Sequence, residues 1–377
     1  MTEISPPAKA PRLLSLDIFR GFTVACMILV NNPGSDPVYA PLEHSVWNGC
    51  TPTDLIFPSF LFMVGVSIVY AMQNKRADTE NHTKMLLHAF RRMVTLILIS
   101  WGIGFFYHHS LDHLRFPGVL QRIAVVYFIA TVLYLKTSQK ALDWIFGIAL
   151  VGYYIIMTFI PVPDGHPANL DPETNMGAWL DRLVFTTNHL WRSSKTWDPE
   201  GLLGTLPAIG TALFGMRVGT WIKRADRDSN TKAAWLFAYG ILAIVVGMLW
   251  DLFFPINKAL WTSSFVLYAG GISTLALTLF YWFIDVQGHR KLFWPFLVFG
   301  TNAISAYILA DIVPGLINFI KINHNGKEMG GMGYFYNTVL APNFVQRNAS
   351  VLDAFALVLL IWILMYPLYK KKIIIKV

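Results

Sequence analysis

The sequence predicts an all-α fold, a polytopic transmembrane helix bundle that forms one domain over residues 1–377. Two observations predict it. The chain is 55% hydrophobic and only 14% charged, and a soluble domain could not keep a mean hydropathy of +0.48 in water. Apolar segments of about 18–26 residues, each long enough to cross a hydrocarbon core of ~30 Å, also recur along the chain. We therefore expect membrane lipid as the surrounding partner.

The apolar segments divide the chain into about ten expected transmembrane helices. The first segment carries Asp17 and Arg20 and lacks a clear small-residue cleavage site, so we expect a retained span rather than a signal peptide. The expected spans are 13–32, 54–73, 87–107, 118–136, 141–162, 202–222, 233–254, 259–284, 292–320 and 351–369.

The distribution of positive charge predicts the orientation of the bundle. Of the 30 Lys and Arg residues, 20 lie in one set of alternate loops and termini and eight in the other set, while Arg20 and Arg122 lie inside spans. The positive-inside rule therefore places both termini in the cytoplasm, with 1–12 as a cytoplasmic tail. The loops 163–201 and 321–350 are then non-cytoplasmic. The formal net charge of +8 reflects this topology, and no nucleic-acid partner is expected.

Polar side chains gather where the first span ends and the second begins. Asn31 closes the first span, and the stretch "HSVWNGCTPTD" brings His44, Trp47, Asn48 and Asp54 to the start of the second. A histidine can exchange protons near neutral pH, and Asp54 could orient it. The structural alternatives are an interfacial histidine bound to a carbonyl and an aspartate that stabilises a helix N-terminus.

Two arginines lie inside expected spans. Arg20 can pair with Asp17 three residues earlier, or it can serve a function, as charged groups in lipid often do. In "FPGVLQRIAVVYF", Gln121 and Arg122 follow the Pro117–Gly118 pair that opens a helix. A guanidinium at this depth could clamp a phosphate or carboxylate through two hydrogen bonds, or it could form a structural ion pair.

The ends of later spans hold a second polar group. "WDPEGLLGTL" contains Trp197, Asp198 and Glu200, with Asp198 as the expected N-cap of the following helix. A tryptophan beside a carboxylate also suits a sugar, through stacking and hydrogen bonds. "PINKALW" supplies Asn257 and Lys258 at a tight turn, where the lysine could anchor an anionic group or be solvated at the interface.

Metal-type residues also occur in the sequence. "YHHSLDH" places His109 and His113 four residues apart, a spacing that could bind zinc on a helix. The segment is expected to be a loop bounded by Pro117 and has no strong ligand signature, so no metal site is expected. Cys26 and Cys50 predict neither a disulfide framework nor a cysteine metal site.

The order of the motifs resembles a known family. From about Leu13 to the C-terminus the chain contains "LLSLDIFRGFTV", "ILVNN", "HSVWNGCTPTDLIFPSFLFMVGVSI", "FPGVLQRIAVVYF", "WDPEGLLGTL", "PINKALWTSSFVL" and "GTNAISAY". This series resembles the heparan-α-glucosaminide N-acetyltransferase family of membrane acetyltransferases. The chain is similar to its shorter bacterial members, because the family's long N-terminal luminal region does not precede the first helix.

The resemblance implies an acetyl-CoA-dependent amino-sugar N-acetyltransferase, with 1–377 as a single transmembrane acyltransferase domain. In that family, the acetyl group of cytosolic acetyl-CoA reaches the amine of a terminal glucosamine across the membrane. By its place before "WNG", His44 resembles the family's essential histidine, as acetyl acceptor or general base, and Asn31 resembles the asparagine that closes the first helix. We expect a bacterial inner-membrane enzyme whose His44 loop faces the periplasm, acting on a simple amino sugar or cell-wall-derived glucosaminide.

The remaining candidate residues receive roles within this expectation. His44, Asn31 and Asp54 are the expected catalytic group. The candidates for binding the co-substrate acetyl-CoA are Arg122, Gln121, Lys258, Asn257 and Arg20, and those for binding the sugar are Trp197, Asp198, Glu200, Trp47 and Asn48. The alternative function is an amino-sugar transporter without acyl chemistry. A homodimer is left open.

Overall fold

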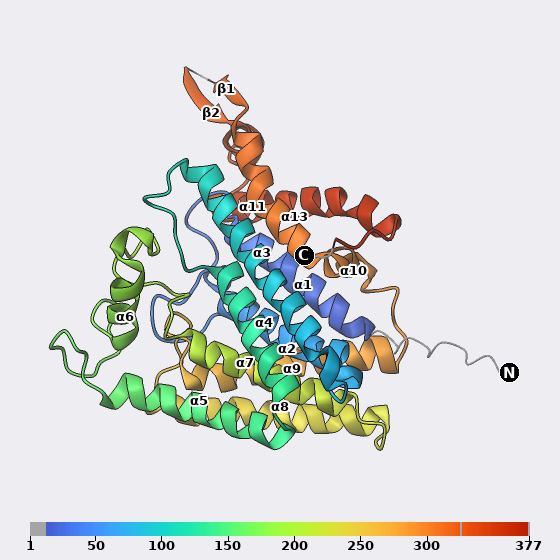
Figure 1. The fold of residues 1–377 in the computed structure, drawn as a ribbon. Helices are drawn as coiled ribbons and strands as arrows, with labels where there is room; N and C mark the ends of the chain where they lie inside the picture. Colours follow the sequence, from blue (N-terminus) through green and yellow to red (C-terminus); the bar gives the residue numbers. More distant parts are fainter. Residues whose placement is uncertain (1–12, 325, 376–377) are drawn as a thin grey trace.

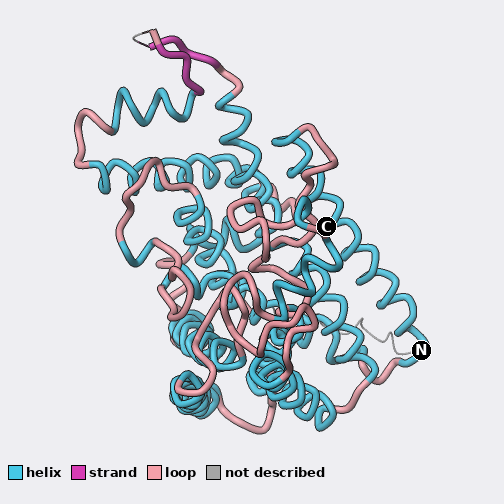
Figure 2. Tube along the Cα trace, turned by 90° about the vertical axis from the view of Figure 1, so that its left-hand side faces the viewer, coloured by secondary structure: helices cyan, strands magenta, loops and turns pink. Residues whose placement is uncertain are grey.

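The computed structural model describes residues 13–324 and 326–375, and it confirms the all-α prediction (Figures 1 and 2). The tail expected at 1–12 lies outside these residues. The helices are α1 Leu14–Asn31, α2 Ile56–Met72, α3 His82–His108, α4 Val119–Lys136, α5 Gln139–Phe159, α6 Met176–Phe185, α7 Thr205–Ile222, α8 Ser229–Asp251, α9 Ser263–Phe280, α10 Trp294–Thr301, α11 Ala303–Asn318, α12 Gly331–Phe335 and α13 Gln346–Lys370. Two short strands, β1 Lys321–His324 and β2 Lys327–Gly330, form an antiparallel hairpin.

Each of the ten expected segments contains a helix, but fewer than ten qualify as spans. Within the described ranges, eight helices are long and apolar enough to cross a membrane, and the bent pair α10–α11 would make a ninth. The helix α7, expected at 202–222, is not among them. It carries Arg217 and packs against α2, α4, α5 and α9 in the interior of the bundle. The chain is thus an integral membrane protein with eight or nine candidate spans.

The expected single helix over 292–320 is wrong, because α10 and α11 meet at an angle of 84°. The break lies at Asn302, whose backbone leaves the helical region at φ −137° and ψ 51°. Its amide Nδ2 donates to Ile373 O, and its Oδ1 accepts from Ile375 N, each at 2.8 Å. Hydropathy could not reveal this break, because both halves are apolar.

Close packing of α2 against α7 places α2 at the centre of the bundle. A Cβ atom at Gly65 would lie 1.9 Å from Ala212 O, and one at Gly215 would lie 2.0 Å from Phe62 O. A larger residue at either position would push the helices apart. α2 also contacts α1, α4 and α9, so its N-terminal end, which carries the candidate catalytic loop, is held by several helices.

The described residues of the two long loops include regular secondary structure. The loop 163–201 contains α6, and 321–350 contains the hairpin and α12. The hairpin projects from one end of the molecule beyond α11 (Figures 1 and 2). It was not predicted, because strands of four residues give too short a pattern to recognise.

Candidate functional site

His44 lies against Asp54, which is in a short 3₁₀ helix, Pro52–Leu55, immediately before α2. The Asp54 side chain is 1% exposed. Its Oδ2 accepts hydrogen bonds from Ser45 N and Thr51 N, each at 3.0 Å, which folds the loop back onto the helix end. Its Oδ1 lies 2.7 Å from His44 Nδ1. An ionised carboxylate can only accept a hydrogen bond, so Nδ1 carries a proton, and a neutral ring would then keep its lone pair on Nε2.

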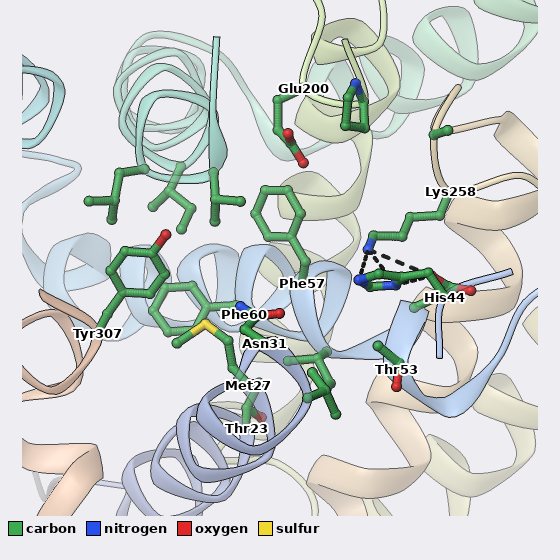
Figure 3. A pocket seen from close by; sticks show the side chains of 18 of the residues that line it. Thr23, Met27, Asn31, His44, Thr53, Phe57, Phe60, Glu200, Lys258 and Tyr307 are labelled. Atoms are coloured by element: carbon green, nitrogen blue, oxygen red, sulfur yellow. Dashed lines mark hydrogen bonds and ion pairs between the residues drawn. The ribbon is translucent and has the colours of Figure 1, made fainter. Parts of the chain in front are cut away.

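The turn between α8 and α9 brings Lys258 to the same place. Asn257 is fully buried. Its Nδ2 donates to Asn48 Oδ1 at 3.1 Å, and its Oδ1 accepts from Leu260 N at 2.8 Å. Asn48 and Asn257 therefore join the two loops instead of lining a cavity. The Lys258 Nζ lies 3.1 Å from His44 Nδ1, 3.4 Å from His44 Nε2 and 3.6 Å from Asp54 Oδ1 (Figure 3).

His44 and Lys258 line a cavity of about 420 Å³, which we call the histidine cavity. α1 contributes Asn31, and the side chains around it in Figure 3 are mostly apolar. The Asn31 amide has no hydrogen-bond partner among residues 13–324 and 326–375. The other labelled lining residues are Thr23, Met27, Thr53, Phe57, Phe60, Glu200 and Tyr307. A largely apolar cavity with a few convergent polar groups is typical of a small-molecule site.

Three tryptophans contribute to the wall of the histidine cavity. The ring of Trp197 meets the rings of Trp47 and Trp191 edge-on, with centroids 5.1 and 5.5 Å apart. The Trp47 Nε1 donates to Leu170 O at 3.0 Å, which fixes that ring. Such a wall offers a sugar ring an apolar face to stack on.

Arg115 holds the two carboxylates that follow Trp197. Its Nε donates to Asp198 Oδ2 at 2.8 Å, and one terminal nitrogen donates to Glu200 Oε2 at 2.5 Å. Burial would raise the pKa of Glu200, but the positive charges of Arg115, Arg122 and Lys258 together outweigh burial and hold that pKa below its usual value. The expected N-cap role of Asp198 is wrong, because α7 begins only at Thr205 and Arg115 occupies the carboxylate instead.

Arg122 and Gln121 do not line the histidine cavity. The Arg122 side chain is 3% exposed and donates to Pro199 O at 3.0 Å and Gly201 O at 2.8 Å. Gln121 Oε1 accepts from Ser100 Oγ at 2.9 Å. These contacts tie the segment 199–201 to α4, which supports the structural alternative for Arg122 over an anion clamp.

Arg20 lines a second cavity of about 370 Å³, which we call the arginine cavity. Its guanidinium donates to Asp17 Oδ1 at 3.3 Å and to Ser67 Oγ at 2.9 Å. His88 and Arg92 of α3 line the same cavity, so three basic side chains converge there. Arg20 is the only one of the five expected acetyl-CoA-binding residues that lines it.

The two cavities lie end to end along the bundle. They share one set of lining residues, which we call the neck: Phe60, Leu96, Ile123, Ala303 and Ile304. α2 lines both, from Ile56 in the histidine cavity to Met72 in the arginine cavity, a rise of about 24 Å. A ligand long enough to pass the neck could therefore occupy both.

The sequence did not single out Arg115, Trp191, His88 or Arg92 as site residues. Arg115 and Arg92 counted only as loop charges in the orientation argument. The positive-inside rule alone explains a basic residue near the end of a span, so the presence of an arginine there did not indicate a functional site. Only the packing of α3 against α4 and of the 163–201 loop over the helix ends places these side chains in cavities.

Comparison with known proteins decides the family. The catalytic region of heparan-alpha-glucosaminide N-acetyltransferase matches residues 12–249, more than half of the chain. The chain belongs to the heparan-alpha-glucosaminide N-acetyltransferase family. The human and mouse heparan-alpha-glucosaminide N-acetyltransferases are each 28% identical to this family member over 431 aligned residues, which cover 98% of it. The chain spans 60% of the length of the human protein and 61% of the mouse protein. The match includes Asn31, His44 and Glu200 but ends before Lys258.

Proposed function

We propose that this family member transfers the acetyl group of cytosolic acetyl-CoA to the amine of an amino sugar on the other side of the membrane. The observation that carries the proposal is the pair of cavities that share the residues of the neck. One end presents three basic side chains, and the other presents His44 beside Lys258. A long anionic donor and a separate acceptor could meet there from opposite sides.

The arginine cavity suits the charged end of acetyl-CoA. Guanidinium groups bind phosphates through paired hydrogen bonds, and Arg20 and Arg92 offer two such groups with His88 beside them. The thioester end of the same molecule would extend through the neck. Residue placement supports this use of Arg20 more than it supports Arg122, Gln121 and Asn257, which are engaged with the protein elsewhere.

The histidine cavity suits the chemistry of acetyl transfer. His44 Nε2 would take a proton from the sugar amine as its nitrogen attacks the thioester carbonyl, or it would first accept the acetyl group itself. In either route a C–N bond forms, the C–S bond breaks, and the released thiolate takes up a proton. The Asn31 amide could donate to the oxyanion, an interaction worth ~3 kcal/mol in the transition state. Asp54 would hold the ring in the required tautomer.

The tryptophan wall and Glu200 suit the acceptor. A sugar ring would stack on Trp191 or Trp197, and the ionised Glu200 would accept a hydrogen bond from a hydroxyl or amine group. Asp198 would contribute indirectly by holding Arg115 in place, and Asn48 would contribute indirectly through its hydrogen bond with Asn257. We propose glucosamine or a terminal glucosaminide as the acceptor and the inner membrane of a bacterium as the location.

The test is the release of free CoA by purified enzyme given acetyl-CoA and glucosamine. We expect CoA and N-acetylglucosamine to appear in equal amounts, because each transfer yields one of each. Reactions without glucosamine and reactions with N-acetylglucosamine as the offered acceptor serve as controls. Uptake of glucosamine into proteoliposomes without any CoA release would contradict the proposal and favour the transporter.

The orientation is tested separately by the accessibility of a cysteine placed at Ser45. We expect the Ser45→Cys variant, in a background with Cys26 and Cys50 replaced by alanine, to react with an impermeant maleimide from the periplasmic side, because the positive-inside rule places this loop there. A matched cysteine at Ser229, in a basic loop of the opposite set, should react from the cytoplasmic side. Labelling of Ser45→Cys only from the cytoplasm would overturn the proposed route of the acetyl group.

A further inference from the structure

The Asp54 carboxylate needs a positive partner. It is almost fully buried, and the donors on its Oδ2 are neutral groups of Ser45 and Thr51. An ionised carboxylate in such a place is stable only with a compensating charge. The cations within 4 Å of it, among the described residues, are His44 and Lys258. If His44 carried that charge, its Nε2 would be protonated and could no longer act as base or acetyl acceptor.

We propose that Lys258 is a positioning residue that supplies the counter-charge for Asp54 and thereby leaves His44 neutral, with Nε2 free to react. The proposal rests on the proposed function of His44. It gives Lys258 a role distinct from the acetyl-CoA binding expected from the sequence, because Lys258 lies in the histidine cavity and the basic side chains of the arginine cavity lie beyond the neck.

The position of the ammonium supports this role. It lies 3.1 Å from His44 Nδ1 and 3.4 Å from His44 Nε2, so a positive charge on the ring would be repelled by the ammonium, and this repulsion favours the neutral ring. The same ammonium lies 3.6 Å from Asp54 Oδ1. The backbone at this turn is fixed by Asn257, and Gly49 N donates to Ile256 O at 2.7 Å, so Lys258 is held over the ring by both loops.

The other titratable groups around the pair do not replace Lys258. Glu200 faces the site from the 198–204 segment, but it already pairs with Arg115. Burial raises the pKa of Cys50 to about 12, so this thiol is neutral at physiological pH. Burial also lowers the pKa of Lys258, while Asp54 and Glu200 favour its charged form. Among the described residues, Lys258 is the cation besides His44 that lies within 4 Å of Asp54, so it is the group that can supply the counter-charge when His44 is neutral.

The test compares the pH dependence of turnover in wild type, Lys258→Met and Lys258→Arg at saturating substrates. Without the lysine, Asp54 should keep a proton on His44, so we expect Lys258→Met to shift half-maximal turnover upward by about one pH unit, to lose up to about tenfold of its turnover at pH values below the wild-type midpoint, and to recover at higher pH. Lys258→Arg should retain the wild-type profile. The KM for acetyl-CoA should be unchanged in both variants, and thermal unfolding in detergent should confirm that both are folded.

A direct readout comes from nitrogen-15 NMR of labelled histidine. We expect the His44 signal at neutral pH to show a neutral ring in wild type and a protonated ring in Lys258→Met, with His44→Ala used for assignment. An unchanged His44 signal and pH profile in folded Lys258→Met would overturn the proposal. A raised KM for acetyl-CoA with no pH shift would also overturn it and return Lys258 to co-substrate binding. Failure of the proposed function is distinguishable, because wild type itself would then release no CoA.

Discussion

His44→Ala is expected to give a folded, membrane-inserted protein that has lost about 10²–10⁴-fold of its turnover. The physical reason is the loss of the one ring nitrogen that combines a lone pair with a fixed direction, set by the contact of His44 Nδ1 with Asp54. The measurement is CoA release with acetyl-CoA and glucosamine at saturation. His113→Ala is the matched control, because His113 is exposed in the loop after α3 and does not line the histidine cavity.

The same variant separates the two chemical routes. Wild type and His44→Ala would be incubated with radiolabelled acetyl-CoA without sugar and then quenched. Label on wild type alone would support an acetyl-histidine, whereas an absence of label on both, together with lost turnover, would support His44 as a base. Turnover near the wild-type rate in His44→Ala would contradict both routes and leave His44 as an interfacial histidine.

Ile304→Trp is expected to lower turnover by about 10²-fold while leaving CoA binding intact. Ile304 lines both cavities at the neck, so the bulkier tryptophan ring would block the thioester there. The thioester would then stop an ångström or more short of His44. The basic side chains of the arginine cavity would be untouched. CoA binding is measured by calorimetry and transfer by CoA release. We expect the variant to bind CoA but to lose acetyl transfer.

Two matched variants make this result specific to the neck. Ile312→Trp lies on the same helix, α11, outside both cavities, and should keep its turnover. Ile304→Ala widens the neck and should also remain active. Full turnover in a folded Ile304→Trp enzyme would show that the acetyl group does not pass this point, and the two cavities would then have to be reached separately.

The sequence by itself determined the features that depend on local pattern. Apolar length predicted a helix in every expected segment, because a residue's hydropathy is independent of its partners. The sequence could also predict the pairing of His44 with Asp54, since the two are ten residues apart in one loop and Thr51 caps the same helix end. Asn31 closes α1 as expected. The catalytic roles of these three residues stay predictions.

Only the tertiary structure decided which distant groups meet. Lys258 contacts His44 although 214 residues separate them in the sequence. The contact forms because Asn257 and Asn48 join two loops, and neither loop's sequence predicts that they pair. Sequence showed that Arg20, Arg115 and Arg122 were cations in or near lipid, but the packing of the bundle decided that one lines a cavity, one holds two carboxylates and one binds buried carbonyls. A charge has the same sign everywhere in a chain, whereas its role depends on the partner that folding places within about 4 Å.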